Sequence, residues 1–297
     1  MLANFHPVQC KPSRAVVLGA GGFIGGTLAG HLCMLGLDVV KLGRRDLDLL
    51  AVDASSRLAE MLRAGDALVF VSAQAPCKNT AMFLDNIRMA ETVCGALKLK
   101  PVAHVVYVSS DAVYKDSDTL ISEASCAEAG SLHGIMHLAR EVMLRTEYSG
   151  PLALVRPTLV YGIDDPHNGY GPNRFVRLAA AGKAITLFGK GEERRDHVAV
   201  GDIALLIGQI LLHRSTGIVN AVSGETASFR ELAEFAAGQF NPRVEILEIP
   251  RSGPMPHNGY RPFALSAALQ LFPEFAFTPW RKGLANVCVQ IQNTKEQ

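Results

Sequence analysis

A glycine-rich loop between a short apolar run and a helical pattern constrains the fold of this chain most. The run AVVLGAG (15–21) ends in glycines, and FIGGTLAGHLCMLG (23–36) then has helical spacing. Gly19, Gly22 and Gly25, three residues apart, permit a tight turn and let backbone N–H groups approach a pyrophosphate. Strand, loop and helix in this order predict a nucleotide-binding βα unit; the alternative is a tight turn that binds no ligand.

The same alternation of strand and helix continues through the first half of the chain. Apolar strand patterns recur at 38–43, 66–73, 104–110 and 152–157, and helical patterns lie between them at 55–65, 80–99 and 132–148. Continuously apolar strands separated by helices are typical of a parallel sheet covered on both faces. Beyond residue 157 the elements become shorter and turn formers more frequent.

These patterns predict an α/β protein, with a Rossmann-type, doubly wound parallel sheet and a smaller C-terminal lobe. Residues 1–157 are assigned mainly to the dinucleotide-binding domain and 158–297 mainly to the substrate-binding lobe. The two are expected to form one integrated unit, in which some C-terminal segments return to the sheet.

Composition excludes several classes of partner. The 29 Lys and Arg residues almost balance the 28 Asp and Glu residues, which argues against nucleic acid or an anionic membrane. No apolar run approaches the ~20 residues of a membrane span. The six cysteines are scattered and lack a C-x-x-C spacing, as expected of a reduced, cytoplasmic protein.

The end of the second predicted strand discriminates between dinucleotides. A carboxylate there would bind a ribose 2′-hydroxyl, whereas an arginine would accept a 2′-phosphate. Arg44 and Arg45 follow Gly43, and Asp46 comes after them. The sequence therefore favours NADP, with NAD as the alternative. If neither arginine contacts a ligand, both are simply exposed to solvent on a loop.

Several motifs together resemble the extended short-chain dehydrogenase/reductase family, the nucleotide-sugar epimerase, dehydratase and ketoreductase group. The resemblance runs in order from about residue 14 to 285. It rests on the glycine loop, DALVFVSA (66–73), SSDAVY (109–114), RPTLVYG (156–162) and ITLFGKGEERRDHVAVGDIA (185–204).

The resemblance implies a role for particular residues. Ser110 matches the catalytic Ser/Thr that hydrogen-bonds the substrate oxygen. Arg195 would hold a substrate phosphate, unless it pairs with Asp202. The cofactor-binding residues would be Gly19, Gly22, Phe23, Ile24, Gly25, Arg44, Asp48, Leu49, Val71, Ser72, Ala73, Asn86 and Pro157, and the substrate-binding residues Asn173, Arg195 and Arg261.

The catalytic dyad of that family is altered in this chain. The family expects Tyr-x-x-x-Lys, usually followed by Glu four residues later. In SLHGIMHLARE (131–141), His133 falls on the tyrosine, His137 on the lysine, and Gly134 and Glu141 match. An imidazole, with an ordinary pKa near ~6.5, can act as a general acid or base, although it is shorter than a phenol.

Two other interpretations of this pair stay open. Histidines four residues apart on a helix can bind zinc, or they can simply share one face of the helix. No glutamate lies between His133 and His137, so we predict no metal.

The predicted function is that of an NAD(P)-dependent nucleotide-sugar epimerase or ketoreductase with an atypical dyad. The alternative is a catalytically silent member of the fold that binds a dinucleotide as a sensor or partner subunit. The expected ligand is a nucleotide sugar, and the resemblance implies a possible homodimer through the helices at 80–99 and 132–148.

Overall fold

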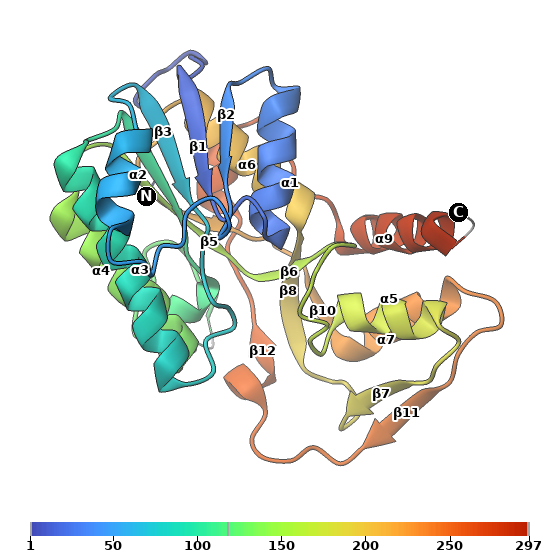
Figure 1. Cartoon of the computed structure of the whole chain (residues 1–297). Helices are drawn as coiled ribbons and strands as arrows, with labels where there is room; N and C mark the ends of the chain where they lie inside the picture. The colour runs from blue at the N-terminus through green and yellow to red at the C-terminus, as the bar shows by residue number, and fades with distance from the viewer. Residues whose placement is uncertain (1, 118, 296–297) are drawn as a thin grey trace.

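A six-stranded, parallel sheet forms the centre of the protein. The computed structural model describes residues 2–117 and 119–295 (Figure 1). The chain starts in the middle of the sheet and builds outward in both directions, as the predicted doubly wound, Rossmann-type fold requires. In spatial order the strands are β2 (Val39–Leu42), β1 (Arg14–Leu18), β3 (Asp66–Phe70), β4 (His104–Val108), β5 (Leu152–Pro157) and β9 (Gly217–Ala221).

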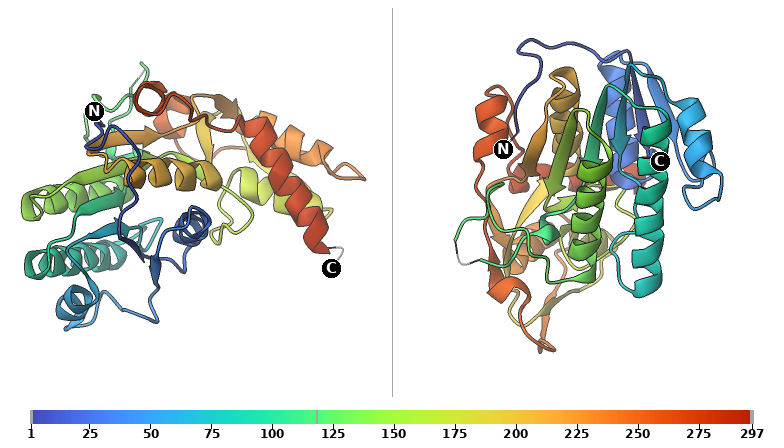
Figure 2. Two further views of the ribbon diagram at one scale, coloured as in Figure 1. Left: turned by 90° about the horizontal axis from the view of Figure 1, so that it is seen from above. Right: turned by 90° about the vertical axis from the view of Figure 1, so that its left-hand side faces the viewer.

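Helices cover both faces of this sheet, which explains why its strands are mainly apolar. Side chains alternate between the faces, so that in β1 Val17 belongs to one core and Val16 to the other. One face packs against α1 (Phe23–Met34) and α6 (Val200–Leu212), and the other against α2 (Ala54–Met61), α3 (Thr80–Leu99) and α4 (Leu132–Glu147) (Figures 1 and 2).

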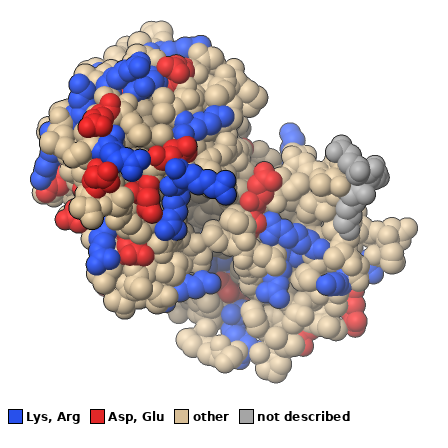
Figure 3. All heavy atoms as spheres, viewed as in Figure 1, with Lys and Arg blue, Asp and Glu red and all other residues tan. Residues whose placement is uncertain are grey.

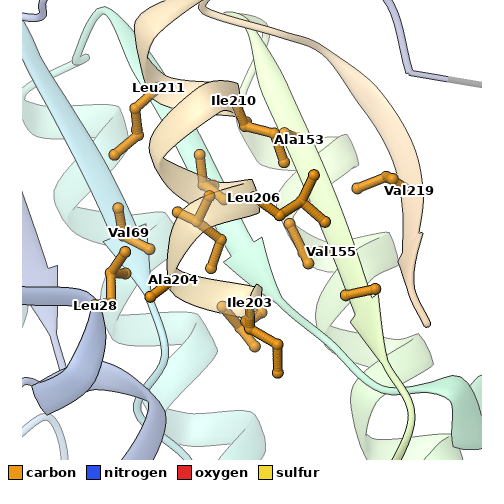
Figure 4. Close-up of a cluster of buried hydrophobic side chains, with 14 of the residues drawn as sticks. Leu28, Val69, Ala153, Val155, Ile203, Ala204, Leu206, Ile210, Leu211 and Val219 are labelled. Carbon is orange, nitrogen blue, oxygen red and sulfur yellow. The ribbon is translucent and has the colours of Figure 1, made fainter. Parts of the chain in front are cut away.

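Helix α6 and strand β9 come from the C-terminal half of the chain but belong to the sheet layer. Leu206 of α6 packs toward Val155 of β5 and Val219 of β9 (Figure 4). Most residues of α6 are buried, including Ile203, Ile207 and Ile210. An apolar helix of this kind must be covered on several sides, and the sheet and α1 provide the cover.

The smaller lobe has a core of its own, below the sheet in Figure 1. Among the described residues, no helix is both long enough and apolar enough to cross a membrane. The remaining elements are η1 (Asp111–Val113), β6 (Leu159–Tyr161), α5 (Pro172–Ala180), β7 (Ile185–Phe188), β8 (Arg194–Ala199), β10 (Thr226–Ser228), α7 (Phe229–Gly238), β11 (Ile246–Ile249), η2 (Pro256–Gly259), β12 (Tyr260–Arg261), α8 (Ser266–Leu271) and α9 (Trp280–Lys295).

Helix α4 is seated tightly against η1, the short turn after β4. A Cβ atom on Gly134 would lie 2.0 Å from the carbonyl oxygen of Ala112, so only glycine fits this contact. Further along α4, the Glu141 carboxylate accepts from Ser109 Oγ at 2.7 Å and from Arg156 Nε at 2.8 Å. These contacts fix the first turns of α4 beside the carboxyl end of β4.

We expect Gly134→Ala to lower the free energy of unfolding by about 1–3 kcal/mol, because the added methyl group forces α4 away from η1. Gly30→Ala is the matched control, since a Cβ at this exposed position of α1 meets nothing within 4 Å. It should raise stability by up to about 1 kcal/mol through helix propensity. Urea unfolding of both variants measures the difference; equal effects would contradict the tight contact at Gly134.

Candidate active site

A cavity of about 830 Å³ lies along the carboxyl ends of the sheet strands. Residues at or just after the ends of five strands line it: Leu18, Leu42, Val71, Val108 and Pro157. Its other side is formed by the smaller lobe, and the space-filling view shows the molecule hollowed between the two parts, with basic side chains at the rim (Figure 3). Ligands bind at this edge in open parallel sheets because the loops there diverge.

The glycine loop forms one end of the cavity, and its shape fits a pyrophosphate. Gly19 has a φ of +93°, and a Cβ on it would lie 2.8 Å from the backbone nitrogen of Ser72. A Cβ on Gly25 would lie 2.1 Å from the carbonyl oxygen of Gly19. Helix α1 begins after Gly22, and no side chain of the described residues caps it, so its first N–H groups are free to hold phosphate oxygens.

The predicted cofactor residues, Asn86 excepted, line the same part of the cavity. Phe23 and Ile24 open α1, and Arg44, Asp48 and Leu49 follow β2. The Arg44 side chain is exposed, with its Nε 3.5 Å from an Asp48 carboxylate oxygen, whereas Arg45 is not among the described residues that line the cavity. Of the two predicted arginines, Arg44 is therefore the one that lines the cavity.

Asn86 lies behind the cavity wall, with its side chain buried in α3. Its amide accepts from the Gln74 N–H at 2.9 Å and donates to the Gln74 carbonyl at 3.0 Å. These bonds hold the segment after β3, in which Val71, Ser72 and Ala73 face the cavity. Asn86 thus shapes the site through the backbone.

Ser110, His133 and His137 all line the cavity. The Ser110 hydroxyl accepts from the Ala112 N–H at 3.1 Å. The two imidazole rings are 4.7 Å apart, centre to centre, and nearly perpendicular. His133 Nδ1 accepts from the Cys77 N–H at 3.3 Å, and His137 Nδ1 lies 2.7 Å from the Tyr107 hydroxyl.

Burial lowers the pKa of both imidazoles. For His133 the Asp111 carboxylate opposes this effect but does not outweigh it. For His137 burial, the neighbouring His133 and the Arg140 guanidinium all act together, and its pKa lies well below 6.5. Among the described residues, no group of three or more His, Cys, Asp or Glu side chains is placed to bind a metal ion.

Arg195 is the one predicted substrate residue that lines the cavity among the described residues. Its guanidinium lies 3.4 Å from Glu193 and 3.8 Å from Asp111. The alternative ion pair with Asp202 is not formed, because the Asp202 carboxylate accepts from both the N–H and the hydroxyl of Thr278. The Arg195 side chain is therefore directed to the cleft.

Arg261 and Asn173 were predicted to contact substrate, but the structure places both behind the cavity wall. Buried Arg261 donates to Asp111 through Nε at 3.2 Å, and Asn173 donates to Asp165 at 2.8 Å. Asp111 and Asp165 both line the cavity. Each of the two predicted residues therefore donates to a carboxylate that lines the cavity.

Three residues of the site were missed by the sequence reasoning. Asp111 directly follows Ser110 in the SSDAVY motif, and this carboxylate beside a predicted catalytic hydroxyl was a usable signal. Tyr107 lies in an apolar strand, and Arg140 lies on the inner face of α4, three residues after His137. For Tyr107 and Arg140, the only signal in the sequence was a polar side chain at a position where the pattern predicts an apolar core residue.

The comparisons with known proteins agree with this fold. The sequence model of the NAD dependent epimerase/dehydratase family matches residues 15–222. A UDP-glucose 4-epimerase of Mycolicibacterium smegmatis (strain ATCC 700084 / mc(2)155) is 29% identical over 229 residues, which are 64% of this chain and 70% of that protein.

Solved structures are similar over nearly the whole chain. Epimerase Mth375 from Methanothermobacter thermautotrophicus has a TM-score of 0.85 at 18% identity, with 96% of this chain and 94% of that chain covered. MoeE5 in complex with UDP-glucose and NAD has a TM-score of 0.81 at 21% identity, with coverage of 96% and 100%. A GDP-L-fucose synthetase from Naegleria fowleri bound to NADP has a TM-score of 0.83 at 16% identity, with coverage of 100% and 99%. At these identities the likeness shows the fold alone.

We expect the protein to lose stability as the pH falls from 7.5 to 5.5. Besides His133 and His137, burial lowers the pKa of His104 to about 4 and that of His197 to about 3. In the unfolded chain these histidines take up protons near pH 6.5, so the stability that they contribute is present above that pH and is lost below it.

Each such histidine adds at most about 1.4 kcal/mol per pH unit to the slope. Urea unfolding at the two pH values should therefore show a smaller loss in the free energy of unfolding for His137→Gln than for the natural chain. His167→Asn, at an exposed side chain, is the control and should keep the natural slope. Identical slopes for all three proteins would contradict the buried, neutral state of His137.

Proposed function

Because the chain belongs to the NAD dependent epimerase/dehydratase family, within the extended short-chain dehydrogenase/reductases, we propose that it is an NADP-dependent enzyme that acts on a nucleotide-activated sugar, by epimerisation or ketone reduction. The observation that carries this proposal is that one cavity is lined by the glycine loop, by Ser110 and His133, and by Arg195.

Different residues of the chain would bind different parts of the two ligands. The N–H groups after Gly22 would hold the pyrophosphate, and Arg44 would contact a 2′-phosphate. A bound nicotinamide accepts or supplies a hydride. The Ser110 hydroxyl and the His133 imidazole, in place of the family's tyrosine, would hold the substrate oxygen at the reacting carbon.

Arg195 would bind the substrate phosphate. A guanidinium suits this task because its planar fork can form two parallel hydrogen bonds to phosphate oxygens. The carboxylates of Asp111 and Glu193 near it are also shared with Arg261 and Arg251, at 3.2 Å and 3.5 Å. These two arginines keep the carboxylates compensated when Arg195 turns to a ligand.

A second function is favoured by one feature of the site. The lysine of the family dyad is replaced by a buried imidazole without a fixed charge. A chain of this kind can bind a dinucleotide and serve as a sensor or partner subunit without turnover. Dinucleotide binding with no conversion of any nucleotide sugar would favour this second function.

We expect NADPH to bind more tightly than NADH in calorimetric titrations. Arg44→Ala should weaken NADPH by roughly fivefold, because an exposed ionic contact is worth about 1 kcal/mol, and should leave NADH unchanged. Arg45→Ala is the matched control and should affect neither ligand. Tighter NADH binding would refute the preference for NADP, and binding of neither dinucleotide would refute the site.

We expect Arg195→Met to weaken UDP-glucose, used as the probe, by tenfold or more, which corresponds to about 1.4 kcal/mol. NADPH affinity should change little. Arg194→Met is the matched control, because the neighbouring Arg194 of β8 donates to Glu231 and to the Thr226 carbonyl, and it does not appear among the described residues that line the cavity. If both ligands weaken together and thermal stability collapses, Arg195 has a structural role instead.

A further inference from the structure

The protonation of His133 follows from its contact with the backbone. The Cys77 N–H points at His133 Nδ1 at 3.3 Å, and an amide N–H can only donate. Nδ1 must therefore be the acceptor nitrogen of the ring. In a neutral imidazole the other nitrogen then carries the proton, so His133 has its hydrogen on Nε2.

The protonation of His137 follows from two residues behind the cavity wall. Its Nδ1 lies 2.7 Å from the Tyr107 hydroxyl, and both side chains are fully or almost fully buried. The positive charge of Arg140 also acts on that hydroxyl. His137 Nδ1 is the one hydrogen-bond partner of this hydroxyl among the described residues, so a buried O–H that did not donate to it would have no acceptor. Nδ1 is therefore the acceptor nitrogen of this ring.

Arg140 is an unusual buried cation. It stacks on the Phe70 ring at 4.3 Å, lies 5.4 Å from the centre of the Tyr107 ring, and donates from Nη2 to the Ser72 carbonyl at 2.8 Å. Its Nε and Nη1 have no hydrogen-bond partner among the described residues, and no carboxylate among them pairs with it. A buried, unpaired charge is costly, so its retention beside the dyad points to a role there.

We infer that His133 and His137 are held as neutral imidazoles with both protons on Nε2, and that Tyr107 and Arg140 are the positioning residues that set this state for His137. The pair therefore offers hydrogen-bond donors to the cavity instead of a base. This inference rests on the proposed function, and it replaces the acid–base role expected of His133 from the sequence.

The chemical consequence concerns the direction of proton movement. A neutral imidazole N–H can polarise a carbonyl and stabilise negative charge developing on its oxygen. It cannot remove a proton from a hydroxyl group, because the nitrogen that faces the cavity already carries one. The carboxylate that lines the cavity nearest Ser110 is Asp111, whose Oδ1 lies 3.4 Å from the Ser110 hydroxyl. The dyad is suited to holding a carbonyl substrate, so of the two proposed reactions it favours ketone reduction over epimerisation.

The surroundings of both rings oppose a charged imidazolium near neutral pH. His133 is faced by the Asp111 carboxylate of η1 and by Cys77 after β3, and its burial outweighs the carboxylate. His137 is faced by Tyr107 of β4 and by the Arg140 cation of α4. A rate that depends on this pair should therefore titrate at a lower pH than an ordinary imidazole does.

Nitrogen-15 NMR of the full chain, labelled at histidine and free of dinucleotide, tests this state directly. We expect the Nε2–H form for both residues at pH 8 and at pH 7, with assignment by His133→Gln and His137→Gln. Tyr107→Phe should give His137 a mixture of the two neutral forms and leave His133 unchanged. Tyr161→Phe is the matched control, because this buried tyrosine lies in the core of the smaller lobe.

Two outcomes would overturn the inference: an Nδ1–H form of either residue, or a cationic ring at pH 7. A His137 spectrum unaffected by Tyr107→Phe would refute the positioning role of Tyr107. Arg140→Met should raise the pKa of His137, whereas Arg140→Lys should keep that pKa as low as in the natural chain. If these variants fail to fold, the spectrum of the natural chain still decides the tautomers. The dinucleotide titration tests the proposed function separately from the NMR experiment. If both histidines carry their proton on Nε2 but no dinucleotide binds, only the proposed function is refuted.

Discussion

The buried ion pair between Glu141 and Arg156 is the interaction on which the geometry of the site depends. It joins α4 to β5, and Ser109 adds a third bond from the end of β4 to the same carboxylate. Both charged side chains are almost completely buried, and removing one partner of such a pair typically costs about 3–5 kcal/mol. With α4 fixed in this rotation, His133 and His137 face the cavity two turns and one turn before Glu141.

A second layer of polar residues holds the groups that line the cavity. Asn86, Arg261, Asn173 and Arg140 contribute little or nothing to its surface, yet each donates to a backbone segment or a carboxylate that does. These bonds connect the cavity wall to the residues behind it, although two donors of Arg140 stay without a partner among the described residues. These residues therefore determine the shape of the cavity from behind its wall. Substituting them should alter the cavity even though they line little or none of it.

The charges of the cavity also follow from this arrangement. Near the lobe, Arg195, Arg251 and Arg261 alternate with Asp111 and Glu193, which gives a nearly balanced network. Near the dyad, by contrast, the Arg140 cation is unpaired among the described residues and the imidazoles are neutral. The Arg140 cation behind the cavity wall thus lies near the position where the family resemblance expects a lysine. It acts on the site through Tyr107 and His137.

Local patterns in the sequence determined the fold class, the glycine loop and the main helices. Helical spacing alone predicted residues 80–99, and α3 spans Thr80–Leu99, because periodicity and glycine geometry are properties of neighbouring residues. Only the tertiary structure decided that β9 joins the sheet, that Arg261 binds Asp111 across 150 positions, and that the Cys77 N–H and the Tyr107 hydroxyl lie against the two histidine rings. A tautomer depends on which donor lies opposite each ring nitrogen, and that donor is brought there by packing between distant segments.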